Sequence, residues 1–369
     1  PLRRMMSRVF WLALFAFPLV AGVYSSRSQV PTLAQDHGLN VILITWDGIR
    51  RDELLGQIDA QHRHATQDRL LTTLSSAALG WTVFGDPGRG GLMTVANTEI
   101  LSLPGYQSIL VGSPQPCFSN TCGQTQATTL FEHVQNELKL PRLKTAVISS
   151  WEGIAYAAAR DTRRIFVNAG VTPLIDGRKD SEIKAINQAQ QADLPAWKSA
   201  RYDEYTHRHA VEYLKAHRPR LMMIGFNDTD EYAHRDQYAS HVQALQAADR
   251  RLGELLATVD SMPGYRENTC VLVTTDHGRG LGASWSRHSN GEPYAGLVAL
   301  YASCPFMQGR VRFEAESQFV THLDIRPTIE TLLGVSTSDC LLCGRSLARI
   351  ESPKLVAAEE GVRGAGGAL

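Results

Sequence analysis

Six side chains in this sequence are of the types that bind transition-metal ions, and most of them follow closely after apolar runs. They are Asp47, Asp230, His234, Asp276, His277 and His288. Three carboxylates and three imidazoles form a ligand set that suits Zn²⁺ or Mn²⁺. Two ions with three protein ligands each would leave open coordination positions, as catalytic sites do. The sequence therefore predicts two divalent metal ions, with Zn²⁺ as the first choice and Mn²⁺ as the alternative.

The spacing of these residues supports the grouping. Asp230 and His234 are four residues apart, so a helical turn would place them on one face. Asp276 and His277 are neighbours at an expected strand end, where Gly278 gives the backbone room to turn. Each residue alone has a plainer interpretation, because Asp after a strand often caps a helix and a lone His is often packed or solvated. Their occurrence together, each at a strand exit, favours the metal site.

Ser102 is a candidate nucleophile for the same site. It precedes Leu103-Pro104-Gly105 and then an apolar stretch of helical type. A Ser at a helix N-terminus is well placed to meet an anion, and metal coordination would help to deprotonate its hydroxyl. The alternative is that Ser102 only caps the helix.

Short apolar runs alternate with longer segments of helical type along most of the chain. The expected strands cover residues 40–45, 144–149, 221–226, 269–274 and 296–302. The expected helices cover residues 129–138, 202–216, 238–259 and 317–333, the last beginning or kinking near Asp324 because of Pro327. Continuous apolar strands are typical of a parallel sheet that is buried on both faces. The sequence thus predicts an α/β fold, a three-layer α/β/α sandwich with a mostly parallel central sheet.

The position of the site follows from this fold. In open α/β sheets, ligands bind outside the carboxyl ends of the strands, where the six candidate ligands are expected. Residues 151–198 are polar and weakly patterned, and we expect them to form an excursion over the active face.

Composition and charge limit the class of protein. The chain has 369 residues, of which 43% are hydrophobic and 20% are charged, and its formal net charge is zero. This is an ordinary globular composition without the basic excess that indicates nucleic-acid binding. We expect a single catalytic domain over residues 38–350 and a flexible Ala- and Gly-rich tail over residues 353–369. The sequence predicts no oligomeric state.

The N-terminal segment indicates export. Arg3, Arg4 and Arg8 precede an apolar run over residues 9–23 and a polar stretch that ends at Gln29. This pattern is typical of a secretory signal peptide, expected over residues 1–29, and predicts a periplasmic or secreted protein. An uncleaved anchor and a buried helix are the alternatives. Only an uncleaved N-terminal segment would bring the protein to a membrane.

Export makes the cysteines candidates for disulfides. Cys117 and Cys122 are close in sequence, as are Cys340 and Cys343, so each pair could close a short loop. We expect a Cys117–Cys122 disulfide. The alternative joins these four cysteines into a structural zinc site. The remaining two lie in or beside apolar runs and are expected to be buried thiols; they are Cys270 and Cys304.

Taken together, the blocks that carry these residues resemble the alkaline phosphatase superfamily. The matching blocks are I-T-W-D-G-I-R around Asp47, S-L-P-G-Y from Ser102, D-E-Y-A-H from Asp230 and T-T-D-H-G around Asp276. His288 before a further strand completes the set. The resemblance covers roughly residues 38–350, and the order of the blocks is far more specific than any one of them.

The details of the blocks sort the branches of this superfamily. The Asp276-His277 pair and His288 are similar to the two-metal branches, which include phosphatases and nucleotide pyrophosphatase/phosphodiesterases. Tyr106 stands where sulfatases carry an Arg, which argues against conversion of Ser102 to formylglycine. The mutases of the superfamily are cytoplasmic, and its phosphoglycerate mutases carry a large inserted domain, so an exported chain of this length fits them less well.

The resemblance implies roles for the individual residues. One ion would be held by Asp230, His234 and His288, and the other by Asp47, Asp276, His277 and the alkoxide of Ser102. Ser102 would form a covalent phosphoserine intermediate. Asn120 would donate a hydrogen bond to a phosphoryl oxygen; the plainer interpretation of Asn120 is a solvated loop residue.

The predicted function is an exported two-metal hydrolase of phosphate esters, either a phosphodiesterase or a phosphatase. Its substrate would be a small-molecule, lipid or glycan phosphoester, selected by residues 151–198 and 85–94. Alternatives within the superfamily are a sulfatase-like or phosphonate hydrolase and a phospho-group transferase. An alternative from another class is an exported metal-binding protein without catalysis, although a complete ligand set with Ser102 argues against it.

Overall fold

The computed structural model describes residues 38–56, 71–89, 91–305, 307, 310–315, 319–337 and 342–351. All of them lie within one compact unit, Leu33–Leu369. The expectations for the signal peptide, the C-terminal tail and Cys340 lie outside the described residues. Within the described ranges, no helix is long and apolar enough to span a membrane.

A seven-stranded sheet forms the centre of the fold, in the order β2-β9-β7-β1-β6-β4-β5. Its strands are β1 (Asn40–Trp46), β2 (Thr82–Phe84), β4 (Thr145–Ser149), β5 (Phe166–Ala169), β6 (Leu221–Phe226), β7 (Thr269–Thr274) and β9 (Leu300–Ser303). The pairs from β7 through β5 are parallel, and only β9 and β2 add antiparallel contacts at one side. The expected mostly parallel central sheet is confirmed.

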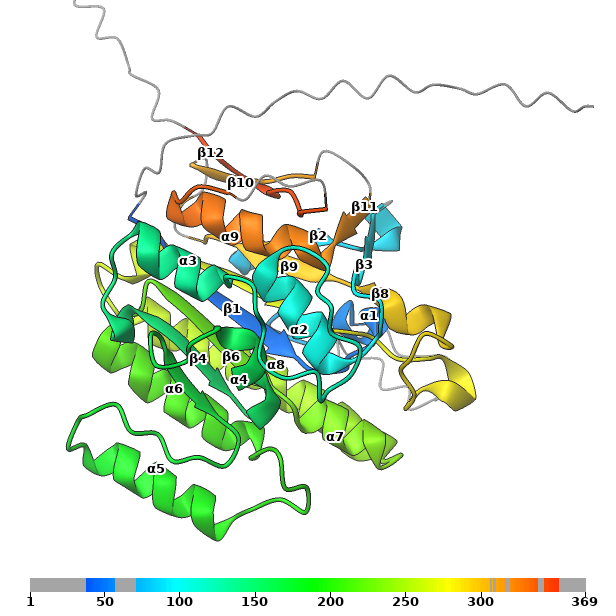
Figure 1. The fold of residues 1–369 in the computed structure, drawn as a ribbon, viewed down its shortest axis with the longest axis horizontal. Helices are drawn as coiled ribbons and strands as arrows, with labels where there is room; N and C mark the ends of the chain where they lie inside the picture. The colour runs from blue at the N-terminus through cyan, green and yellow to red at the C-terminus, as the bar shows by residue number, and fades with distance from the viewer. Residues whose placement is uncertain are drawn as a thin grey trace, which may run out of the picture. The chain divides into compact units, whose positions relative to one another are not determined.

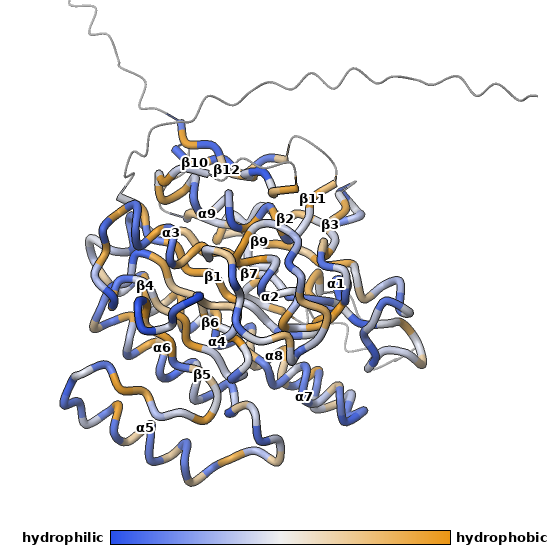
Figure 2. The backbone as a smooth tube through the Cα atoms, in the orientation of Figure 1, coloured by the Kyte–Doolittle hydropathy of each residue, from blue (hydrophilic) through white to orange (hydrophobic). Residues whose placement is uncertain are grey.

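Helices cover both faces of this sheet, because the side chains of β1 alternate between two apolar clusters (Figure 1). One face carries α2 (Ser102–Val111), α3 (Leu130–Glu137) and α9 (Ile325–Leu333), and the other carries α6 (Asp203–His217) and α8 (Tyr238–Asp260). Val41 and Leu43 point to the first cluster, whereas Ile42 and Ile44 point to the second. Figure 2 shows the apolar colour concentrated on the central strands. The three-layer arrangement therefore follows from the continuous apolar runs.

Shorter elements complete the described part of the chain. The remaining helices are α1 (Arg51–Leu54), α4 (Ala155–Ala158), α5 (Ser181–Ala192) and α7 (Asp228–His234). A second sheet joins β11 (Phe319–Thr321), β3 (Leu92–Thr94) and β8 (Leu297–Val298), and β10 (Val311–Phe313) pairs with β12 (Ala348–Ile350).

The structure corrects two expectations about elements and confirms a third. The run 296–302 is split at Ala299, so that β8 and β9 belong to different sheets. Within the expected segment 317–333, the helix begins at Ile325, beside Asp324 as expected, after strand β11 and a 3-10 turn. Pro327 therefore lies in the first helical turn, where proline is tolerated. Residues 151–198, expected to be a weakly patterned excursion, instead supply α4, which packs against α2, edge strand β5, and α5, which packs against α6.

The cysteines form disulfides in the described chain. The expected Cys117–Cys122 bond is confirmed, which excludes a zinc site made of the four loop cysteines. The expectation of buried thiols was wrong, because Cys270 and Cys304 are bonded to each other. They lie one residue beyond the paired ends of the antiparallel strands β7 and β9, and their Cα atoms are 4.2 Å apart. Cys343 is also disulfide-bonded.

Candidate metal centre

Three neighbouring parallel strands deliver the carboxylates to one edge of the sheet. Asp47 follows β1, Asp276 follows β7, and Asp230 lies in the first turn of α7 after β6. The register pairs Thr45 with Thr274, so Asp47 and Asp276 each lie two residues beyond a matched pair. Parallel strands therefore bring together residues that are more than two hundred positions apart in the sequence.

The first ligand group is deeply buried and consists of Asp47, Asp276 and His277. One ligand atom from each lies within 4.8 Å of the others, and the exposed fraction of each residue is 1% or less. The Nε2 atom of His277 is 3.5 Å from Asp276 Oδ2 and 3.8 Å from Asp47 Oδ1. We call these three residues the buried group.

The second group, Asp230, His234 and His288, is more open, and we call it the open group. Its ligand atoms also lie within 4.8 Å of one another. Asp230 and His234 share one face of α7, with Oδ2 and Nε2 3.0 Å apart, and His288 Nε2 lies 3.4 Å from His234 Nε2. The His234 side chain remains 48% exposed.

The two groups adjoin each other through their histidines. The rings of His277 and His288 stack with their centroids 4.1 Å apart and an angle of 13° between their planes. Two ions held by adjoining groups can act on one substrate, which is the arrangement of two-metal hydrolases.

Each carboxylate has one oxygen engaged by the surrounding protein. Tyr106 Oη donates to Asp47 Oδ2 over 3.1 Å, and the backbone N–H of Gly48 donates to Asp276 Oδ1 over 3.1 Å. Arg279 forms an ion pair with Asp230 Oδ1. The other oxygen of each carboxylate faces its ligand group. This arrangement favours one ligand oxygen per carboxylate.

Two histidines are oriented in the same manner. His277 Nδ1 is 2.9 Å from the carbonyl oxygen of Gly278, and His288 Nδ1 is 2.9 Å from that of Ile100. A carbonyl oxygen only accepts, so Nδ1 carries the proton in both rings and Nε2 keeps the lone pair that a metal requires. Such backbone partners are the usual outer support of metal-binding histidines.

The electrostatics of the buried group call for a cation. Burial, with the nearby Asp276 and Asp230 carboxylates, raises the pKa of Asp47 well above its ordinary value. Burial, with Asp230, raises the pKa of Asp276 to about 7. Asp276 Oδ2 is buried and has no hydrogen-bond partner among the described residues. Anionic oxygens facing imidazole nitrogens fit Zn²⁺ or Mn²⁺.

The histidines of the two groups are held in different states. Burial lowers the pKa of His277 to about 4 and that of His288 to about 3, so both are neutral at physiological pH. The hydrogen bond and charge of Asp230 raise the pKa of His234 above its ordinary value. Neutral imidazole is the form that binds metal ions.

Ser102 lies against the buried group. It is the first residue of α2, and its Oγ lies 3.3 Å from Asp47 Oδ1 and 3.3 Å from His277 Nε2. The capping position is occupied by Leu101, so the interpretation of Ser102 as a simple helix cap was wrong. The hydroxyl is therefore placed among the candidate ligand atoms.

Asn120 lies beside the N-terminus of α2, in the loop closed by Cys117–Cys122. Its Oδ1 accepts a 2.9 Å hydrogen bond from the backbone N–H of Leu103. This bond orients the amide and leaves the Nδ2 hydrogens as donors. The exposed Asn120 is thus fixed close to Ser102.

Sequence reasoning missed Arg279 and the contacts of Tyr106 and Gly48. An Arg two residues after a predicted ligand was the available signal for Arg279. Glycine at position 278 permits a close approach of two segments of the chain, because a Cβ there would lie 2.8 Å from the carbonyl oxygen of Leu297. Its φ is not positive, so the need for glycine is steric. Arg50 is 3% exposed and pairs with Glu53.

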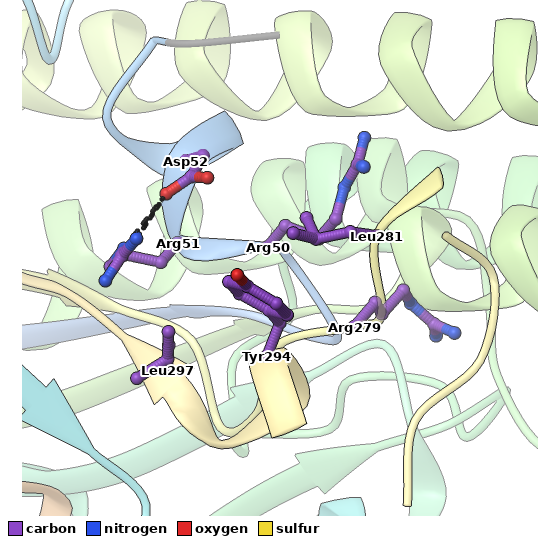
Figure 3. Close-up of a pocket in the computed structure, with 7 residues that line it drawn as sticks. All are labelled: Arg50, Arg51, Asp52, Arg279, Leu281, Tyr294 and Leu297. Carbon is purple, nitrogen blue, oxygen red and sulfur yellow. Dashed lines mark hydrogen bonds and ion pairs between the residues drawn. The ribbon is translucent and has the colours of Figure 1, made fainter. Parts of the chain in front are cut away.

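A small pocket lies beside the centre (Figure 3). Its lining residues are Arg50, Arg51, Asp52, Arg279, Leu281, Tyr294 and Leu297. It includes neither Ser102 nor any of the six candidate ligands. Arg51 pairs with Asp52, and Arg50 pairs with Glu53 outside the pocket, so these cations are already compensated. We therefore place the chemistry at the ligand groups.

Comparison with known sequences is consistent with this chemistry. The Metalloenzyme superfamily profile matches residues 60–294. The chain belongs to this superfamily, which is of the alkaline phosphatase type. A 2,3-bisphosphoglycerate-independent phosphoglycerate mutase of Synechococcus sp. (strain JA-3-3Ab) is 24% identical over 56% of this chain and 36% of its own length. The chain spans 12% to 36% of the length of the curated mutases it matches.

Solved structures show the same fold at low identity. The lipoteichoic acid synthase LtaP of Listeria monocytogenes has a TM-score of 0.57 and 14% identity, over 87% of this chain and 78% of that chain. A 2-O GAG sulfatase has a TM-score of 0.55 and 13% identity, over 85% of this chain and 73% of that chain. These likenesses confirm the fold expected from the resemblance to the alkaline phosphatase superfamily.

Proposed function

We propose that this metalloenzyme hydrolyses phosphate diesters through a covalent intermediate on Ser102. The observation that carries the proposal is the position of the Ser102 hydroxyl, 3.3 Å from one carboxylate and one imidazole of the buried group. The open group would hold one ion with Asp230, His234 and His288. The buried group would hold the other with Asp47, Asp276 and His277, joined by Ser102. When bound, the ions supply Lewis-acid stabilisation of the phosphoryl and leaving oxygens and lower the pKa of coordinated hydroxyl groups.

The residues of the chain would perform the remaining steps. Ser102 Oγ forms a bond to phosphorus as the bond from phosphorus to the leaving alcohol oxygen breaks, and the alcohol leaves with the proton of Ser102. The intermediate is a serine-linked phosphodiester that keeps the second ester group of the substrate. Water then attacks the phosphorus of this intermediate, which breaks its bond to Ser102 Oγ, releases the phosphate monoester and returns a proton to Ser102. Asn120 Nδ2 donates to a non-bridging phosphoryl oxygen, in an orientation fixed by the Leu103 N–H.

The charge around Ser102 favours a diester over a monoester. A diester carries one negative charge, whereas a monoester carries nearly two at neutral pH. The oriented donor beside Ser102 is the neutral Asn120. The buried cation Arg279 is already paired with Asp230 and donates to three backbone carbonyl oxygens. A site whose oriented donor is neutral has less compensation for a second negative charge.

We further propose that the enzyme works outside the cytoplasm on a small-molecule, lipid or glycan phosphodiester. The N-terminal pattern and the two disulfides defined among the described residues support export, because such bonds persist mainly in oxidising compartments.

The test is a substrate panel on protein loaded with zinc or manganese. We expect bis-p-nitrophenyl phosphate to be cleaved with a higher kcat/KM than p-nitrophenyl phosphate, and p-nitrophenyl sulfate to be cleaved slowest. An acid-quenched reaction with the diester should show a p-nitrophenyl phosphoryl group on the peptide that contains Ser102. Fastest cleavage of the sulfate would contradict the proposal in favour of a sulfatase. Transfer to an added alcohol in preference to water would favour a transferase.

A further inference from the structure

Arg279 connects the segments that carry the ligands. Its side chain is only 1% exposed, and its three guanidinium nitrogens contact three different stretches of chain. Nε donates to the carbonyl oxygen of Gly48 over 2.8 Å, Nη1 donates to that of Ser286, and Nη2 pairs with Asp230 Oδ1. In Figure 3 this residue lies at one side of the small pocket.

Each of these stretches carries a ligand of one of the two groups. Gly48 follows Asp47, and Ser286 lies two residues before His288. Arg279 itself lies two residues after His277. One side chain therefore joins the exit of β1, helix α7 and the loop of His288. A planar guanidinium presents donors on three nitrogens in fixed directions, whereas all donors of an ammonium group lie on one nitrogen.

We propose that Arg279 is a positioning residue that holds Asp230 to a single ligand oxygen and thereby sets the ion affinity of the open group. Asp230 Oδ1 is occupied by Arg279, and Oδ2 remains 3.0 Å from His234 Nε2. The inference rests on the metal sites of the proposed function and not on the choice of ester.

Gly48 provides independent support for this arrangement. An ideal Cβ at this position would lie 2.8 Å from Arg279 Nη2 and would also collide with Asp230 Oδ1. The residue also has φ +62°, a conformation that glycine adopts at little cost. Glycine at position 48 thus leaves the space in which the Arg279–Asp230 pair lies.

Two effects of Arg279 on a bound cation oppose each other. Its charge repels the ion, so removing it would strengthen binding. Its bonds orient Asp230 and the His288 loop, so removing them would weaken binding. Loss of such outer supports typically lowers metal affinity by about 10- to 100-fold. Arg279 is already compensated by Asp230, so we expect the loss of orientation to dominate.

The experiment compares Arg279→Met, which removes charge and bonds, with Arg279→Lys, which keeps the charge but has all its donors on one nitrogen and so cannot bridge the three segments. Arg326→Met is the matched control. Arg326 is also buried and pairs with one carboxylate, that of Glu330, while donating to the carbonyl oxygens of Val111 and Thr128. The full chain is freed of metal, refilled with Zn²⁺ by calorimetric titration and melted thermally.

We expect the wild type to bind two ions. Both Arg279 variants should bind one of these ions about 10- to 100-fold more weakly, while their affinity for the other ion changes less than threefold. Arg326→Met should lower the melting temperature and keep both affinities. Unchanged or tighter binding by Arg279→Met, or an equal loss in Arg326→Met, would overturn the inference. A wild type that binds no ion would instead overturn the proposed function.

Discussion

The buried and open groups contain similar ligands but are built by different parts of the fold. In the buried group, the three ligands leave the two central strands β1 and β7 and are almost fully covered. In the open group, two ligands come from the short helix α7 and the third from a loop, and His234 is half exposed. The sheet register therefore determines the geometry of one group, whereas local anchors determine that of the other.

The loop of His288 illustrates the second kind of support. His288 Nδ1 contacts the carbonyl oxygen of Ile100, and Asn290 Oδ1 accepts a 3.1 Å hydrogen bond from the backbone N–H of Ile100. Asn290 Nδ2 also donates to the carbonyl oxygen of Thr98 over 2.9 Å. The open group thus depends on contacts with the segment that leads to Ser102. We expect the two groups to respond differently to mutation, pH and chelation.

The largest effect should come from Ser102→Ala, which tests whether the buried group includes the nucleophile. We expect kcat on a diester to fall by on the order of a thousandfold or more, since no other group takes over the covalent step. Ion content should remain near wild type, because the three other ligands of that group are intact. Ser108→Ala is the control, because Ser108 is buried in the same helix and its Oγ lacks a hydrogen-bond partner among the described residues. Wild-type turnover by Ser102→Ala would show that another group attacks phosphorus.

The next effect separates the two groups by deleting one imidazole from each. His277→Ala and His288→Ala should each lose one ion, with affinity lowered by about a hundredfold or more for a site left with fewer protein ligands. Only His277→Ala should also lower the free energy of unfolding of the metal-free protein, by roughly 1–3 kcal/mol, because His277 is completely buried.

A buried histidine outside the site serves as control for this pair. His209 is fully buried on α6 and contacts Asn187 Oδ1 through Nε2. His209→Ala should lower stability but keep both ions. Equal destabilisation by His277→Ala and His288→Ala would contradict the difference between the two groups. Metal analysis and chemical denaturation measure these outcomes.

The third effect concerns pH. The pKa of Asp276 is raised to about 7 and that of Asp47 is also raised, so the buried group must release protons when an ion binds. Its affinity should therefore fall as the pH decreases below about 7, by about tenfold per pH unit for each proton released. In the open group the pKa of Asp230 is lowered despite burial, through Arg279 and His234, so only His234 should release a proton.

Calorimetry in two buffers of different ionisation enthalpy counts these protons. His288→Ala should report mainly the buried group, and His277→Ala mainly the open group. We expect up to about two protons from the buried group and about one from the open group. The same pH slope for both variants would mean that depth of burial does not control proton competition at this centre.

The smallest effect should come from Gly48→Ala. We expect ion affinity to fall by about threefold to tenfold, because the new methyl group pushes on Arg279 and Asp230. Gly80→Ala is a close control, since Gly80 has φ +60° and an added Cβ would meet nothing within 4 Å. Backbone strain should lower the free energy of unfolding of both variants by about 1 kcal/mol. Only Gly48→Ala should change ion binding, as measured by calorimetric titration.

The sequence predicted the buried group well because strands end where apolar runs end. Asp47 and Asp276 lie directly beyond β1 and β7, and the parallel register brings them together. The spacing of Asp230 and His234 likewise predicted one helix face, which α7 confirms. The seven-stranded sheet was predicted in outline, although the four-residue edge strand β5 was too short and too mixed in character to be recognised.

The parts that were not predicted depend on long-range contacts without a local signal. Arg279 acts through backbone carbonyls, which every residue possesses, so its partners cannot be inferred from residue type. The break at Ala299 arises because β8 and β9 pair with strands of different sheets, although the run is apolar throughout. Cys270 and Cys304 resemble buried apolar residues in sequence, and only the antiparallel pairing of β7 and β9 makes them bonding partners.

The Cys270–Cys304 disulfide has a consequence for limited proteolysis. The bond encloses both ligands after β7, the His288 loop and strand β8 within one covalent ring. A single cut at an exposed residue of this ring, such as Ser289 or Asn290, would leave two fragments tied together. Such a nicked chain would run as one band on a non-reducing gel and as two after reduction. The activity of the nicked chain, measured before and after reduction, would therefore distinguish the effect of the cut itself from the effect of losing the C-terminal fragment.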